Sequence, residues 1–250
     1  MILRRLAENL RAQNWTAIVV EFILVIVGVF LAILAANWNL ERLERRETGR
    51  LLSQLDTELT FFIGGMDSIA RYYAVSDHFA HRAMAGWRGD PSVSDNEFVI
   101  AAYQASQING IGTNSLVWAQ IFGAENLRNI DDLGLRRNLR QALTFDYGLV
   151  NLTAAMSRYR EEVRKVIPDD LQAAIRAKCG DVPQPDGSLI LPARCGLLLP
   201  TAEAARTARA LRARTDLVSE LNWHQAKIAT QMQNIANLKL YCVRLIRQIG

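Results

Sequence analysis

The stretch TAIVVEFILVIVGVFLAILAA, residues 16–36, decides the architecture of this 250-residue chain. Of its 21 residues 18 are apolar, and the exceptions are Thr16, Glu21 and Gly28. As a helix that rises about 1.5 Å per residue, the stretch is long enough to cross the roughly 30 Å hydrocarbon core of a bilayer. The sequence therefore predicts a transmembrane helix over residues 15–38, and a wholly soluble protein is excluded as the leading interpretation.

A cleaved signal peptide is the main alternative for this stretch. The apolar core of a signal peptide is about 7–15 residues long and ends in an A-x-A-like site. This run is longer, and Ile33 and Leu34 fit that cleavage pattern poorly. We therefore favour an uncleaved signal anchor. Trp15 and Trp38 lie at the two ends of the run, where amphipathic rings prefer the membrane interface, so we expect both to be interfacial anchors.

The composition of the whole chain excludes several classes of protein. Half of the residues are hydrophobic, which excludes disorder, and no second long apolar run follows the first, which excludes a polytopic transporter. The sequence contains no P-loop, no G-x-G-x-x-G, no G-x-S-x-G and no H-E-x-x-H motif. We therefore expect a protein that is not an enzyme and that needs no cofactor.

Positive charge does not orient the span. Three arginines precede it and four follow it closely: Arg4, Arg5, Arg11, Arg42, Arg45, Arg46 and Arg50.

A second signal for the orientation comes from Cys179 and Cys195, which flank a proline-rich stretch that a disulfide would close. Disulfides persist in the periplasm and not in the cytosol. The alternatives are two reduced cysteines in a cytosolic loop, or a zinc site, which would need two more ligands. The disulfide favours a cytoplasmic N-terminus and a periplasmic C-terminal domain, with Cys242 packed as a small apolar residue.

Proline placement divides the remaining chain into helices and one long loop. The six prolines lie at 91, 168, 183, 185, 192 and 200, so long segments lack the strongest helix breaker. We expect an all-α fold, in which the membrane helix continues into an elongated antiparallel bundle of the four-helix type. The predicted segments are a short cytoplasmic N-terminus over 1–14, the transmembrane helix over 15–38, and an extramembrane domain over 39–250 with helices at about 39–87, 94–122, 131–167 and 201–249 and a loop over 168–200.

The first and last of these helices carry apolar residues in a 3,4 alternation that is typical of a coiled-coil seam. The first seam comprises Leu52, Leu55, Leu59, Phe62, Met66, Ile69, Tyr73, Ala80, Ala83 and Trp87, and the last comprises Val218, Leu221, Ile228, Met232, Ile235, Cys242, Ile246 and Ile249. Gln225 and Lys239 interrupt the second seam, which lowers stability while fixing register. Gly49 and the pair Gly64 and Gly65 are the expected weak points of the first helix.

An up-down order of helices would return the C-terminus to the membrane-proximal end. The segment Leu238–Ile249 mixes apolar residues with Lys239, Arg244 and Arg247, a composition that suits a lipid headgroup surface. A bundle helix with a solvated basic face explains the same composition, and we favour it. Four arginines between positions 206 and 214 spread around their helix, so we expect no nucleic-acid partner.

Glu21 is the most informative residue of the span, because an ionised carboxylate within a bilayer costs free energy. Gly28, Ala32 and Ala35 share its face of the helix, and small residues at such spacing allow another helix to approach closely. We predict that this face packs against a membrane protein partner or against a second copy of the chain. A carboxylate that is protonated, or that reaches toward the cytoplasmic surface, remains the alternative.

His78 and His81 lie three residues apart beside Asp77, and with His224 they could share a metal ion. Surface histidines are the favoured interpretation, so no metal site is predicted.

Two blocks of sequence resemble a widespread bacterial family of uncharacterised single-pass membrane proteins. The first block is Val20-Glu21-Phe22 followed by Gly28-Val29-Phe30 and Asn37-Trp38-Asn39, and the second runs from Ser115-Leu116 to Tyr147. The chain departs from the family pattern in its turn, Phe122-Gly123-Ala124-Glu125. The resemblance implies a membrane-anchored helical domain without an established activity.

Together these features predict a non-enzymatic, single-pass protein of the bacterial inner membrane. We expect an accessory or scaffold subunit that acts by association with a larger membrane complex or with itself. The alternative is a periplasmic sensor domain that binds a small molecule between its helices and signals through a membrane partner.

Overall fold

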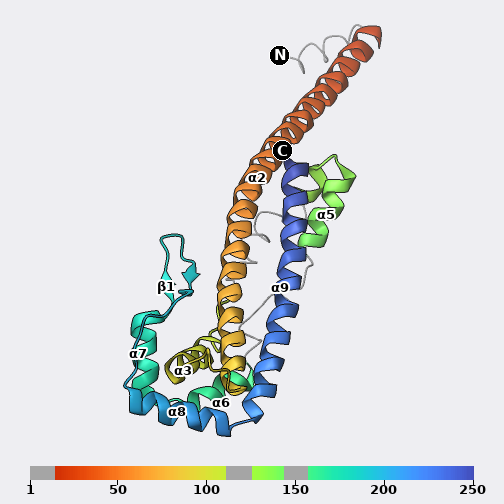
Figure 1. Cartoon of the computed structure of the whole chain (residues 1–250). Coiled ribbons are helices and arrows are strands. Elements are labelled where there is room, and N and C mark those ends of the chain that lie inside the picture. Colours follow the sequence, from red (N-terminus) through yellow and green to blue (C-terminus); the bar gives the residue numbers. More distant parts are fainter. Residues whose placement is uncertain (1–14, 111–125, 144–156) are drawn as a thin grey trace.

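The computed structural model describes residues 15–110, 126–143 and 157–250. The fold is all-α, as predicted, and its long N-terminal helix packs against later helices. Two long helices, α2 (Trp15–Trp87) and α9 (Asp216–Ile249), run antiparallel, and α9 covers only the distal part of α2 (Figure 1). Shorter helices gather around the distal end, so the molecule is a rod with a thickened end.

α2 continues without a break from the apolar stretch into the distal domain. Gly49, Gly64 and Gly65, the expected weak points, stay within the helix, and a methyl group at each would meet nothing within 4 Å. The helix ends just before Gly89, which has a positive φ of 72°. The long proline-free segment thus forms one helix of 73 residues.

The predicted seam joins α2 to α9. The seam residues of α2 that are buried are Leu55, Leu59, Met66, Ile69, Tyr73, Ala80 and Ala83, and those of α9 are Leu221, Ile228, Ile235 and Cys242. Lys239 Nζ lies 2.5 Å from Asp67 Oδ1, an ion pair that joins the two helices. The C-terminus therefore returns toward the membrane-proximal end, as the up-down order required (Figure 1).

The helix expected over 94–122 ends earlier within the described residues. α3 (Asp95–Gln104) begins at Ser94, whose hydroxyl accepts a hydrogen bond from the Glu97 backbone N–H in a typical N-cap. Its residues Phe98–Gln104 are buried, because α2, α6 and α8 pack around it. Residues 111–122 of the expected helix lie outside the described residues.

The helix expected over 131–167 is represented by two described helices. A 3₁₀ turn, η1 (Asn126–Asn129), precedes α5 (Leu133–Leu143), which lies beside the C-terminal part of α9 (Figure 1). α6 (Arg158–Val166) lies in the distal cluster. Residues 144–156 lie outside the described residues.

The prediction that 168–200 is only a loop was wrong. The segment contains α7 (Asp169–Cys179) and a short antiparallel hairpin of β1 (Val182–Pro183) and β2 (Leu189–Ile190). Pro168 stands just before the first turn of α7, where its missing N–H costs nothing. The loop was predicted from the prolines of the segment as a whole. Residues 169–179 contain no proline, and Leu171, Ile175 and Cys179 form a buried stripe there.

The last predicted helix is divided in two. α8 (Thr201–Ala213) stops at Arg214, and α9 starts at Asp216 with no proline or glycine between them. Leu211 and Leu217 are both fully buried. In one straight helix their side chains would diverge by about 120°, so the break lets both reach the core. Trp87 Nε1 holds the break by donating to the Leu211 carbonyl at 2.8 Å.

Candidate functional site

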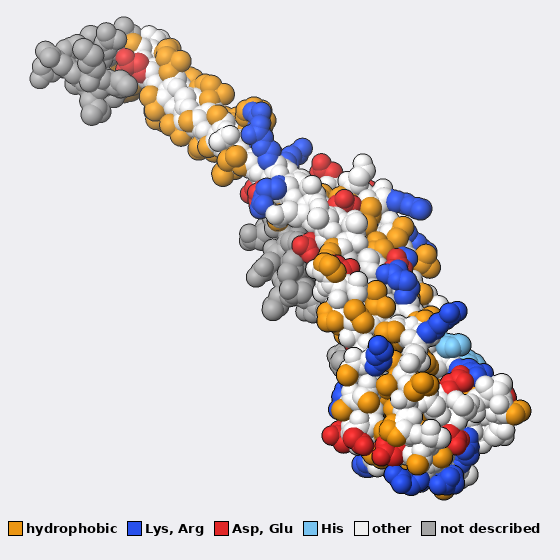
Figure 2. All heavy atoms as spheres, turned by 60° about the vertical axis from the view of Figure 1, so that its left-hand side comes forward, with side chains coloured by type: hydrophobic (Ala, Val, Ile, Leu, Met, Phe, Trp, Pro, Cys, Tyr) orange, Lys and Arg blue, Asp and Glu red, His pale blue; other side chains and the backbone are white. Residues whose placement is uncertain are grey.

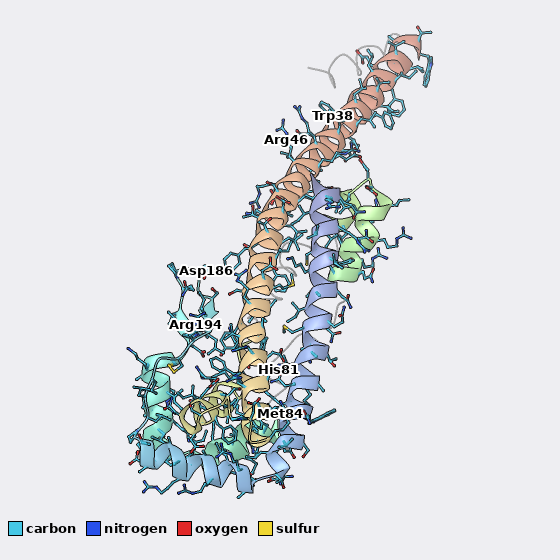
Figure 3. The ribbon with its side chains drawn as sticks, viewed as in Figure 1. Trp38, Arg46, His81, Met84, Asp186 and Arg194 are labelled. Atoms are coloured by element: carbon cyan, nitrogen blue, oxygen red, sulfur yellow. A yellow bond between two sulfur atoms is a disulfide. The ribbon has the colours of Figure 1, made fainter. Side chains whose placement is uncertain are left out.

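The apolar stretch of α2 is bare in the structure. It forms a helix long and apolar enough to cross a membrane, and none of that window is buried by the described protein. On the face drawn in Figure 2, apolar side chains line the stretch, and basic side chains lie where it ends. Trp15 and Trp38 are exposed at its two ends, and the Arg42 guanidinium lies 5.7 Å from the centre of the Trp38 ring. Figure 3 places Trp38 and Arg46 at the same transition.

The small-residue face of the span has no partner among the described residues. Gly28 has nothing within 4 Å of the position that a Cβ would occupy, and Ala32 and Ala35 are exposed. The Glu21 Oε2 atom is shielded from solvent, yet it has no hydrogen-bond partner in the described structure. Gly28, Ala32 and Ala35 are therefore accessible to another helix in a single copy of the chain.

The C-terminal segment Leu238–Ile249 packs within the protein. Leu238, Cys242 and Leu245 are buried, and Asn138 Nδ2 of α5 donates to Gln248 Oε1 at 2.9 Å. Because Lys239 stands level with Asp67, the C-terminus is level with about residue 56 of α2, roughly 27 Å along the helix from Trp38. Protein contacts thus account for most apolar residues of this segment, whereas Leu240 is 58% exposed.

Cys179 and Cys195 form a disulfide with a Cα–Cα distance of 5.5 Å, within the usual range. The bond closes the segment that carries the β1–β2 hairpin. Gln104 Nε2 of α3 donates to the Cys179 carbonyl at 2.5 Å, so the buried core holds one end of the disulfide. Cys242 is a free, buried cysteine, and burial raises the pKa of its thiol to about 12.

The histidines do not assemble a metal site. His81 Nδ1 lies 3.4 Å from Asp77 Oδ2 on the exposed face of α2, whereas the His78 ring contacts Phe79 edge-on. Within the described ranges, no group of three or more His, Cys, Asp or Glu side chains is placed to hold a metal ion. His224 lies elsewhere and is buried in the core.

His224 makes a buried contact that the sequence did not suggest. Its Nδ1 lies 2.7 Å from the Ser157 hydroxyl, and its ring packs against Tyr159. Burial lowers the pKa of His224 to about 4, and the positive charges of Arg160 and Lys227 act in the same direction. The imidazole is therefore neutral near pH 7. Because His224 is 1% exposed, this pair anchors α9 and is not an open catalytic dyad.

Two arginines of α6 fix the turn that follows α3. Arg160 Nη1 donates to the Ser106 carbonyl at 2.5 Å, and Arg164 Nε donates to the Ser106 hydroxyl at 3.1 Å. The Arg164 guanidinium also stacks over Tyr103 at 4.6 Å. Burial lowers the pKa of both arginines. Because backbone and side-chain acceptors already engage them, we assign them a structural role.

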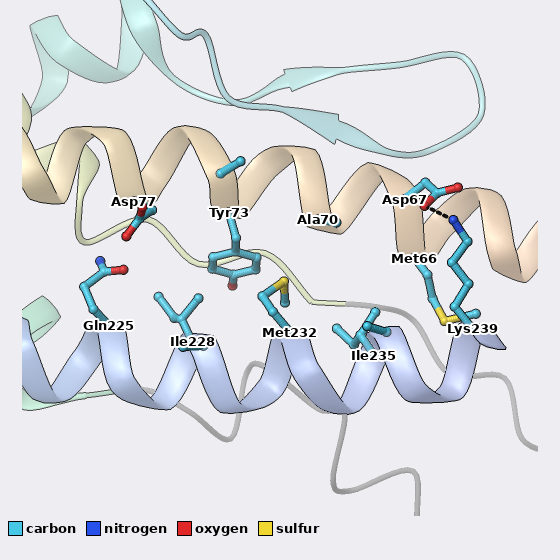
Figure 4. A pocket seen from close by; sticks show the side chains of 13 residues that line it. Met66, Asp67, Ala70, Tyr73, Asp77, Gln225, Ile228, Met232, Ile235 and Lys239 are labelled. Atoms are coloured by element: carbon cyan, nitrogen blue, oxygen red, sulfur yellow. Dashed lines mark hydrogen bonds and ion pairs between the residues drawn. The ribbon is translucent and has the colours of Figure 1, made fainter. Parts of the chain in front are cut away.

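A groove of about 560 Å³ lies between α2 and α9 (Figure 4). Its floor is formed by seam residues such as Met66, Tyr73 and Ile228. Its sides carry alanines, Ala70 and Ala74 on α2 and Ala229 and Ala236 on α9. Because alanine fills little space beside the seam, the two helices leave an apolar channel between them.

Polar side chains stand at both ends of this groove. At the end nearer the apolar stretch of α2, the ion pair between Asp67 and Lys239 crosses from one helix to the other (Figure 4). At the distal end, Asp77 of α2 faces Gln225 of α9. The Gln225 Nε2 atom is shielded from solvent and has no hydrogen-bond partner in the described residues.

Sequence reasoning missed the groove, although it had named the seam residues that form the floor. Gln225 was interpreted as an interruption of the α9 seam, and Lys239 both as an interruption and as part of the basic C-terminal segment. The two residues lie at the two ends of the groove. The alanines beside both seams were a further signal for the groove. They indicate a groove only once the register of the two helices is known, because the alanines of one helix must lie opposite those of the other.

Comparison of the chain with protein-family models, with curated proteins and with solved structures gives no match. The resemblance to a single-pass bacterial family therefore stays a prediction.

Proposed function

We propose that the protein is a non-enzymatic, membrane-anchored accessory or scaffold subunit that acts by association. Its partner is a membrane protein of a larger complex or a second copy of the same chain. The observation that supports this proposal is the small-residue face of the span, where Gly28, Ala32 and Ala35 are open to another helix and the Glu21 Oε2 atom has no hydrogen-bond partner in the described structure. Lipid tails do not satisfy a carboxylate, so Glu21 gains most from a protein partner.

The continuity of α2 gives such an association a consequence outside the membrane. One helix joins Glu21 to Trp87, and the Trp87 ring packs edge-on against Phe98 at 5.0 Å between ring centres. A partner that docks on the span therefore fixes the orientation of the distal domain. This arrangement suits a scaffold.

Assembly size in lipid nanodiscs tests the association. The double variant Glu21→Ala with Gly28→Leu is expected to lose the co-purifying subunit, or to convert a dimer into a monomer, by native mass spectrometry. Phe30→Leu is the matched control, because residue 30 lies about 200° around the helix from Gly28. An assembly size that is the same in wild type, double variant and control would refute association through this face.

The orientation that we propose is a cytoplasmic N-terminus and a periplasmic distal domain in a bacterial inner membrane. The disulfide between Cys179 and Cys195 supports it, since such bonds persist in oxidising compartments. Alkaline phosphatase fused at Gly250 is expected to be active, and a fluorescent protein that folds only in the cytosol is expected to stay dark. The opposite pattern would reverse the topology.

A second candidate function is ligand binding by a sensor domain. The groove between α2 and α9 favours it, because a volume of about 560 Å³ lies in the range of small-molecule sites. A signal from such a ligand would reach the membrane along α2 and pass to a partner.

A further inference from the structure

We propose that the groove between α2 and α9 binds an uncharged single-chain amphiphile, with its apolar chain between the alanines and its hydroxyl or amide head between Asp77 and Gln225. This inference rests on the second candidate function, ligand binding, and is independent of association through the span.

The dimensions of the groove suit an extended chain. Asp67 and Asp77 stand ten residues apart on α2, which is about 15 Å along the helix axis. Between them the walls are alanines and the floor is apolar, and Met66 and Met232 are unbranched side chains that adapt to irregular shapes. An alkyl chain would cover apolar surface that the two helices leave accessible.

The ends of the groove favour a small molecule over another helix. The 2.5 Å contact between Asp67 Oδ1 and Lys239 Nζ forms a bar across the groove at its membrane-proximal end. A docked helix would continue past this point and would have to displace the ion pair. A ligand of finite length fits between the bar and the polar distal end without disturbing either.

The distal end defines the head group. Gln225 Nε2 is a shielded donor that no described residue satisfies, and Asp77 presents a carboxylate from the facing helix. A hydroxyl or amide could accept from Gln225 and donate to Asp77 at the same time. A carboxylate or phosphate head would instead meet the negative charge of Asp77. An uncharged head is therefore the better match.

Photocrosslinking of the full chain in nanodiscs tests this assignment, because it separates groove binding from partition into the bilayer. The probe is a monoacylglycerol whose medium-length chain carries a diazirine, and the comparison probe is the fatty acid with the same chain. We expect the monoacylglycerol to label peptides that cover residues 66–77 and 225–239, and the fatty acid to label them several-fold less.

Variants that fill the groove locate the site. Ala74→Phe and Ala236→Phe are expected to reduce this labelling by about tenfold or more, because each places a ring where the chain would lie. Ala226→Phe, at an exposed position of α9 outside the groove lining, is the matched control and should label as the wild type does. Ala236→Leu replaces the Phe variant if thermal melting shows that the latter is misfolded. Gln225→Leu should reduce labelling about fivefold.

The outcomes distinguish ligand binding in the groove from the preference for an uncharged head group. If neither probe labels the groove peptides, or if the filling variants label as the control does, ligand binding in the groove is refuted. If the fatty acid labels the groove as strongly as the monoacylglycerol, ligand binding stands and the uncharged head is refuted. Assembly size in the same nanodiscs reports separately on association.

Discussion

The two halves of α2 differ in what surrounds them. From residue 19 to residue 47 nearly every side chain is exposed, and Leu31 is 58% exposed. From Thr48 onward the helix buries one stripe, and Leu59 is 0% exposed. The same backbone thus passes from a bare segment to a segment covered by α9, α3 and the hairpin.

The sequence difference behind this contrast is how apolar residues are distributed around the helix. Up to residue 36 of the bare half they occupy nearly the whole circumference, so no single protein contact could cover them, whereas a bilayer could. In the covered half they occupy one seam, and polar residues face water. The covered half should therefore respond to substitutions through folding, and the bare half through association or insertion.

The largest difference in stability between the two halves is expected from a matched pair of leucine-to-alanine substitutions. Leu59→Ala should lower the free energy of unfolding by about 3 to 4 kcal/mol, because it leaves a cavity in the α2–α9 seam. Leu31→Ala should change it by less than about 0.5 kcal/mol, since no described protein packs there. Urea unfolding of the distal domain, followed by circular dichroism in detergent, measures both. Equal losses would mean that the bare half is also packed in the folded protein.

Loss of the disulfide should come next in size and should affect the covered half alone. The bond joins residues 16 positions apart, for which loop closure contributes about 3 kcal/mol in the chain-entropy model. Cys179→Ser with Cys195→Ser is expected to lose that amount in the same urea titration. Reduction of the wild type should give the same midpoint as the variant, and Cys242→Ser, which leaves the disulfide intact, is the control. A midpoint that does not move on reduction would contradict this prediction.

Low pH should destabilise the covered half of α2 and not the bare half, because His224 packs in the covered part. Its folded pKa of about 4 is below the value of about 6.5 expected in the unfolded chain, so protonation favours unfolding. The His224 contribution to stability is complete above about pH 7 and is lost as the pH falls through 6.5 toward 4. At pH 5 the loss should be about 2 kcal/mol relative to pH 8. His224→Gln should remove this part of the pH dependence, and a variant whose pH profile matches the wild type would refute the assignment.

Sequence reasoning was most successful where one physical signal dominated. The apolar run and the 3,4 seams predicted α2, the antiparallel α9 and the all-α class, because a long amphipathic helix is specified by its own spacing. Breaks in that spacing were harder to predict. Arg214 ends α8 without any breaker residue, since the burial of both Leu211 and Leu217 decides the break, and that burial depends on the tertiary structure.

The candidate sites divide in the same way. Glu21 and Gly28 could be found from spacing along one helix. The groove depends on which residues of α9 stand opposite Ala70 and Ala74, and the Ser157–His224 contact joins residues 67 positions apart. A single sequence contains no measure of such register, so these features required the structure.

The smallest expected effect concerns Asp67 and Lys239, the ion pair that joins α2 to α9 in the covered half. Their side chains are 41% and 37% exposed, and ion pairs this accessible contribute about 0.2 to 1 kcal/mol. A double-mutant cycle with Asp67→Asn and Lys239→Gln should give a coupling energy in that range, measured by urea unfolding, and high salt should reduce it. The pair Arg50 and Glu47, which lies within α2 where α9 does not reach, is the matched control. If the coupling of Asp67 to Lys239 is no larger than that of the control pair, then the seam alone sets the register, and the bar across the groove is free to open.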